Sequence, residues 1–109
     1  THASTLVFRQ KAVVDIAKAN FGIVPMAVAT GSTREIAEFE LKQIGIWSMF
    51  DALVGAEDVT NHKPSPDVYL EAARRINVDP KRCQAYEDTD IGLEAARAAG
   101  MVAFDVRGM

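Results

Sequence analysis

The chain has 109 residues, of which 49% are hydrophobic and 25% charged, and 12 basic against 15 acidic side chains give a net charge of −3. This composition excludes a disordered tail and is typical of one soluble globular domain. The acidic balance disfavours a nucleic-acid partner, and no apolar run approaches the roughly 20 residues that cross a membrane, so we expect no membrane partner either. The single cysteine, Cys83, excludes an internal disulfide bond and fits a cytoplasmic location. We therefore expect a single domain over residues 1–109 in the cytoplasm.

The first predicted elements are a strand, a helix and a second strand. Residues 5–8 (TLVF) combine β-branched and aromatic side chains, which favours a short strand, although they could equally begin the following helix. Apolar side chains at helical spacing predict a helix over residues 11–20, and Gly22 ends it. The continuous apolar run at residues 25–29 predicts a strand that is buried on both faces.

A second helix and a third strand follow. The helix is predicted over residues 33–44, because Ser32 and Glu35 form an S-x-x-E capping box at its start. Gly45 suits the position just after its end. The apolar residues 52–56 then predict another buried strand.

Two further helices and two further strands complete the chain. Ser65 as a cap and Pro66 as the first helical residue predict the start of a helix. A strand over residues 83–86, a helix over residues 90–99 and a strand over residues 102–106 come after it. Helices and strands thus alternate along the chain, which predicts a doubly wound α/β fold with a parallel sheet and right-handed crossovers.

Polar residues follow three of the predicted strands. The carboxyl ends of parallel strands meet at one edge of a sheet, where ligands bind. Hydroxyl and backbone N–H groups at a helix start hold phosphate oxygens, a lysine neutralises phosphate, and carboxylates suit Mg²⁺. In chain order these residues are Thr30, Gly31, Ser32, Glu57, Asp58, His62, Lys63, Glu87 and Asp88. The set predicts a site for a phosphate ester and a divalent metal.

Each member of this set also has a purely structural interpretation. Ser32 could serve only as a helix cap, and Lys63 could be an ordinary solvated loop lysine. Glu87 and Asp88 could favour the start of the last helix through its dipole. His62 is expected at the surface. Only the coincidence of these residues at three successive strand ends favours a functional site.

Residues 26–106 resemble the catalytic core of haloacid dehalogenase-like hydrolases, in the branch of small-sugar phosphatases and β-phosphoglucomutases that includes fructose-1-phosphate phosphatase-like proteins. Residues 27–32 (AVATGS) resemble the second motif of that family. Lys63 within HKPSPD resembles the third motif, and residues 87–92 (EDTDIG) resemble the fourth. The resemblance implies a Rossmann-like three-layer α/β sandwich with a mostly parallel sheet, here without the cap domain of the family.

The resemblance also implies roles for individual residues. Thr30 would position the transferring phosphoryl group, with Gly31 and Ser32 completing the phosphate-binding loop. Lys63 would stabilise the phosphate and the nucleophile. The carboxylates that hold Mg²⁺, directly or through water, would be Glu87 and Asp88. The implied reaction is Mg²⁺-dependent phosphoryl transfer from a small phosphorylated metabolite such as a sugar phosphate.

The first motif of the family, D-x-D-G-T, does not occur in this sequence. Its first aspartate is the family's nucleophile and its second the general acid-base. In one interpretation, residues 5–8 replace the central strand, and Arg9 and Lys11 occupy the positions of the two aspartates. Neither side chain can form an acyl-phosphate, but both could bind an anion.

The absence of the first motif is also compatible with two alternatives. The chain could be a truncated core whose sheet lacks the central strand, and the unpaired interior edges would then favour a homodimer, strand exchange or a partner strand. Alternatively, Asp88 and Asp90 could form a disguised D-x-D pair around Thr89. We expect almost no turnover with residual metal and phosphate affinity. The rival functions are a phosphate-binding pseudoenzyme and an interaction fragment completed by another chain or by its own copy.

Overall fold

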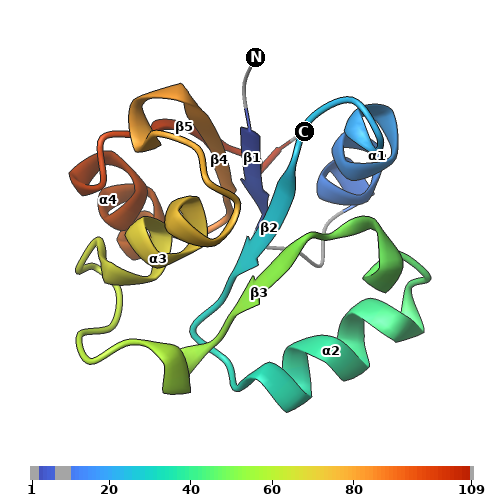
Figure 1. Cartoon of the computed structure of the whole chain (residues 1–109), viewed down its shortest axis with the longest axis horizontal. Helices are drawn as coiled ribbons and strands as arrows, with labels where there is room; N and C mark the ends of the chain where they lie inside the picture. Colours follow the sequence, from blue (N-terminus) through green and yellow to red (C-terminus); the bar gives the residue numbers. More distant parts are fainter. Residues whose placement is uncertain (1–2, 7–10, 109) are drawn as a thin grey trace.

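Residues 3–6 and 11–108 are described by the computed structural model of the chain. Its strands are β1 (Ala3–Leu6), β2 (Met26–Ala29), β3 (Ala52–Val54), β4 (Cys83–Glu87) and β5 (Val102–Asp105). They form one sheet in the order β3-β2-β1-β4-β5, and every neighbouring pair is parallel (Figure 1). The predicted parallel α/β sheet is therefore confirmed. The strand predicted at residues 52–56 is shorter than expected, because Ala56–Asp58 turn into a short 3-10 helix.

In the described part of the chain, four α-helices cover the sheet: α1 (Lys11–Asn20), α2 (Arg34–Gln43), α3 (Asp67–Arg75) and α4 (Asp90–Ala98). In Figure 1, α3 and α4 lie on one face of the sheet and α1 and α2 on the other. This arrangement confirms the three-layer sandwich. Within the described ranges, no helix combines the length and the hydropathy that a membrane span requires.

Side chains of β2 enter both layers of the core, as a strand covered on two faces requires. Ala27 and Ala29 pack in the cluster that includes the α3 residue Tyr69. Met26 and Val28 pack in the opposite cluster. Both clusters hold β2 rigidly, and the residues at its carboxyl end are therefore fixed in space.

The centre of the sheet is occupied by β1, which pairs with β2 on one side and with β4 on the other. A strand therefore stands in the central place, and its described part, Ala3–Leu6, overlaps the predicted strand at residues 5 and 6. Phe8 and Arg9 lie outside the described residues, and Lys11 is the first residue of α1. The described sheet has no unpaired interior edge, so the argument for strand exchange from such edges does not apply to it.

Two predicted helix starts are each wrong by one residue. The cap of α2 is Thr33, whose hydroxyl accepts a hydrogen bond from the Ile36 amide at 3.3 Å, and not Ser32. Ser65 does not cap α3, because its hydroxyl donates to Asp67 Oδ1 at 3.0 Å. At α2, Ser32 and Thr33 are neighbouring hydroxyl residues, and either could cap the helix. At α3, Pro66 can stand either before the helix or as its first residue, so the sequence pattern fits more than one start.

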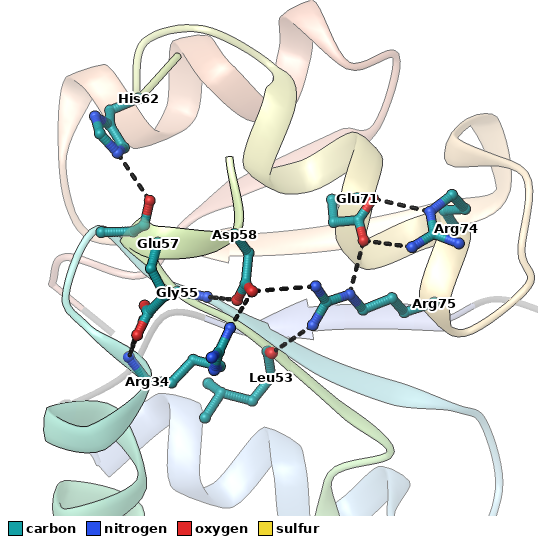
Figure 2. A network of polar contacts seen from close by, with 10 residues as sticks. Arg34, Leu53, Gly55, Glu57, Asp58, His62, Glu71, Arg74 and Arg75 are labelled. Atoms are coloured by element: carbon teal, nitrogen blue, oxygen red, sulfur yellow. Dashed lines mark hydrogen bonds and ion pairs between the residues drawn. The ribbon is translucent and has the colours of Figure 1, made fainter. Parts of the chain in front are cut away.

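The outer strand β3 is covered along its edge by one side chain. Arg75, the last residue of α3, donates from Nη1 to the Leu53 carbonyl oxygen at 3.0 Å. Its Nε also donates to Glu71 Oε2 at 2.8 Å, one turn back on the same helix. The guanidinium thus ties α3 to the strand that ends beside the predicted site (Figure 2).

Candidate functional site

Three segments that are distant in sequence meet at the carboxyl edge of the sheet. Lys63, in the loop before α3, places its Nζ 2.6 Å from Oε2 of Glu87, the last residue of β4. The same Nζ lies 3.4 Å from the carbonyl oxygen of Ala29, the last residue of β2. Because Ala29 precedes Thr30, the structure brings the predicted lysine, a predicted carboxylate and the start of the predicted phosphate loop together.

Glu87 is a buried carboxylate, with 1% of its surface exposed. Its Oε2 accepts hydrogen bonds from Lys63 Nζ and from the hydroxyl of Tyr69. The Thr89 hydroxyl lies 3.4 Å from the other oxygen, Oε1. A buried charge is tolerated when it is paired and hydrogen-bonded, and Glu87 meets both conditions.

Tyr69 is the residue of this cluster that sequence reasoning missed as functional, since the helical pattern assigned it only to the inner face of α3. It is fully buried, and burial together with the nearby Glu87 raises the pKa of its hydroxyl well above the usual value. The hydroxyl therefore stays protonated and donates. Lys63 Nζ also lies 5.1 Å from the centroid of the Tyr69 ring, a cation–π distance. A tyrosine on a buried face that otherwise carries only aliphatic side chains is the available signal, because a buried hydroxyl needs a partner.

The loop after β2 is held by short-range hydrogen bonds. Thr30 is nearly buried, its amide donates to the Val54 carbonyl at 3.0 Å, and its Oγ1 accepts from the Ser32 amide at 3.1 Å. The Ser32 carbonyl accepts from the Ala56 amide at 2.8 Å. Gly31 is exposed, and a Cβ built on it would meet nothing within 4 Å. The loop therefore has a fixed backbone with open space beside it.

Asp88 and Glu87 differ in what they could offer a metal ion. Asp88 is half-buried and makes no hydrogen bond or ion pair with the described residues. Glu87, in contrast, is committed to Lys63 and Tyr69. Among residues 3–6 and 11–108, no group of three or more histidine, cysteine or acidic side chains could hold a metal. Mg²⁺ is usually held by one or two carboxylates together with water and phosphate oxygens, and the predicted Glu87–Asp88 pair stays a prediction.

Glu57 and Asp58 take part in a polar network with arginines of α2 and α3 (Figure 2). The Glu57 carboxylate accepts from the Arg34 amide at 3.0 and 3.3 Å, where a negative charge favours the start of α2. Asp58 accepts from the Gly55 amide at 2.8 Å and forms ion pairs with Arg34 and Arg75. Although burial opposes it, these contacts lower the pKa of Asp58. Both acids therefore hold β3, α2 and α3 together.

His62 is exposed, as expected, with Nε2 3.0 Å from the Ala56 carbonyl oxygen. The suggested D-x-D pair receives no support from the geometry. The Thr89 side chain caps α4 by accepting from the Gly92 amide at 3.0 Å, and the exposed Asp90 pairs with Arg107 at 2.7 Å. Asp90 is thus bound away from the cluster around Lys63.

Comparison with known proteins decides the family. The sequence model described as haloacid dehalogenase-like hydrolase matches residues 11–106. The chain belongs to this family. Membership confirms the resemblance carried by the motifs around Thr30, Lys63 and Glu87.

Within the haloacid dehalogenase-like hydrolases, several relatives are phosphatases or mutases of sugars. Fructose-1-phosphate phosphatase YqaB of Escherichia coli is 51% identical over 94 residues, which are 86% of this chain and 50% of that protein. The structure of CbbY from Rhodobacter sphaeroides in complex with phosphate is 33% identical with a TM-score of 0.81, over 92% of this chain and 46% of that one. The structure of β-phosphoglucomutase from Clostridium difficile is 29% identical with a TM-score of 0.69, and the match covers 83% of this chain and 38% of that one.

The chain spans half or less of the length of each of these three proteins. The similarity thus covers the sheet and helices described above.

Proposed function

We propose that this chain forms the phosphate-binding core of a phosphatase that acts on small phosphorylated sugars. The observation that carries the proposal is the position of the Lys63 ammonium, held at 2.6 Å by Glu87 and 3.4 Å from the Ala29 carbonyl. A positive charge thereby lies at the start of the loop formed by residues 30–32. The relatives, a fructose-1-phosphate phosphatase among them, suggest the substrate class.

Each proposed role follows from the chemistry of the residue. The Thr30 hydroxyl and the loop formed with Gly31 and Ser32 bind phosphate oxygens, because hydroxyl and backbone N–H groups near a helix start suit an anion. Lys63 offsets the charge of the phosphate dianion. Asp88, with its carboxylate unengaged by the described residues, is the proposed ligand for Mg²⁺, which would add further positive charge beside the phosphate when bound.

We expect the isolated chain to bind phosphate with almost no turnover. The sequence has no D-x-D-G-T motif, so no aspartate of that motif is present to form the covalent aspartyl-phosphate. Loss of a nucleophile removes most of the rate whatever binding survives. In this form the chain acts as a phosphate-binding module.

Titration of the purified chain with inorganic phosphate by calorimetry tests the proposal. Thr30→Val and Lys63→Ala should each abolish binding, whereas Lys81→Ala should leave it unchanged, because Lys81 is exposed in the short helix before β4. An unmutated chain that binds no phosphate would contradict the proposed site. Robust Mg²⁺-dependent hydrolysis of sugar phosphates would contradict the expected lack of turnover.

A further inference from the structure

One carboxylate oxygen in the site serves two donors that come from different segments. Glu87 Oε2 accepts from the Lys63 ammonium and from the Tyr69 hydroxyl. Tyr69 lies on the inner face of α3, where its neighbours in the core include the small residues Ala72 and Ala73. A phenylalanine ring would fill the same space, so packing alone does not account for the hydroxyl.

The two donors share the negative charge of a single oxygen. The hydroxyl is neutral, and its hydrogen bond to an ionised acceptor is of the stronger, charge-assisted kind. The Tyr69 hydroxyl therefore supplies part of the hydrogen bonding that the buried Glu87 carboxylate needs, independently of Lys63. The Lys63 ammonium has three N–H donors, of which the carboxylate takes one and the Ala29 carbonyl, at 3.4 Å, is a weak second partner.

We propose that Tyr69 is a positioning residue for the phosphate site, whose hydroxyl anchors the Glu87 carboxylate so that Lys63 is directed to the end of β2 with a donor left for an anion. Without the hydroxyl, Oε2 of Glu87 would depend on Lys63 alone, and the ammonium would be drawn further into the ion pair. This inference rests on the proposed function, since it assigns the group that orients the lysine of that site.

The test compares the whole chain with its Tyr69→Phe variant, which keeps the ring and removes the hydroxyl. Tyr86→Phe is the matched control, because the Tyr86 hydroxyl bonds Gln84 at 2.7 Å and its ring stacks on Phe104, within β4 and β5. The ¹⁵N NMR signal of the Lys63 ammonium reports its surroundings without any ligand. Titration with inorganic phosphate reports the site, and thermal unfolding shows that each variant is folded.

We expect the Lys63 signal to shift in Tyr69→Phe and to stay in place in Tyr86→Phe. Phosphate affinity should fall about tenfold in Tyr69→Phe, which corresponds to about 1.4 kcal/mol, and should not change in the control. A purely structural role for the hydroxyl would lower the unfolding temperature without either effect.

Two results overturn the inference while the proposed function stands: an unshifted Lys63 signal in folded Tyr69→Phe, or unchanged phosphate affinity in that variant. If the unmutated chain binds no phosphate, the proposed function fails. The orienting role of Tyr69 is then decided by the Lys63 signal alone, which supports it by shifting and overturns it by staying in place.

Discussion

The carboxylate of Glu87 fills the space that a side chain on Gly92 would need. A Cβ at Gly92 would lie 2.1 Å from Glu87 Cδ and Oε1, closer than any real contact. Gly92 stands in the first turns of α4, where glycine is less favourable than alanine by about 1 kcal/mol. The buried ion pair on β4 thus dictates the residue on a neighbouring helix.

Gly92→Ala should destabilise the protein although alanine favours a helix. The gain in helix propensity is at most about 1 kcal/mol, whereas overpacking costs about 1–3 kcal/mol and displacing a buried paired charge costs more. Thermal and urea unfolding measure the difference. Gly31→Ala is the control, because its Cβ would meet open space. Equal losses of stability in both variants would show that the Glu87 carboxylate does not occupy the space beside Gly92.

Removing Lys63 should expose the cost of an unpaired charge at Glu87. Because Glu87 is 1% exposed and the Lys63 side chain 11%, Lys63→Met should cost about 3–5 kcal/mol of unfolding free energy. Glu87→Gln in the same background should recover part of that loss, because the amide carries no charge. A double-mutant cycle by urea denaturation measures the coupling, and additive effects would show that the pair is not formed.

Stability and phosphate binding should separate at two neighbouring residues. Thr33→Ala removes the cap of α2 and should cost about 1 kcal/mol. Ser32→Ala should change stability by less than about 0.5 kcal/mol, because its hydroxyl caps no helix, but should weaken phosphate binding. Unfolding and phosphate titration of both variants decide this. The reverse order of stabilities would restore Ser32 as the cap.

Stability should fall in acid through Glu71. Hydrogen bonds from Arg74 and Arg75 lower the pKa of Glu71 from 4.5 to about 2. Since the folded state holds the carboxylate ionised, its stabilisation is complete above pH 4.5 and is lost as the pH falls towards about 2. Glu71→Gln should therefore be less stable than the unmutated chain at pH 7, with the gap closing between pH 4.5 and about 2. A gap that is constant over this range would contradict the lowered pKa.

The fold could be predicted because its signals are local. Short apolar runs separated by amphipathic segments indicate a parallel α/β sheet, and polar residues after each run indicate the site edge. The polar residues after the runs predicted Lys63 and Glu87 at one edge of the sheet, and the structure brings them together there. The place of β1 at the centre of the sheet agrees with one of the interpretations of residues 5–8, and its described part begins two residues earlier than predicted.

The roles of the individual polar residues depend on contacts between distant segments, which no local sequence pattern records. The bond between Tyr69 and Glu87 spans 18 residues, and the bonds of Glu57 and Asp58 to Arg34 span 23 and 24 residues. Glu57 and Asp58 lie just beyond β3, much as Glu87 and Asp88 lie at the end of β4, yet the structure uses Glu57 and Asp58 to join β3 to helices. Sequence position identified the acids, but only the packing of α2 and α3 decided their roles.

The hold of Arg75 on β3 has a consequence for assembly. A strand added at that side must first remove a guanidinium that is bound to the Leu53 carbonyl, to Glu71 and to Asp58. Charged side chains over an outer strand are a known protection against edge-to-edge aggregation. At the opposite margin, Val102 of β5 leaves half of its surface in contact with solvent. The outer edge of β3 is therefore protected by Arg75. We expect a further strand to add there more slowly than to an uncovered strand edge.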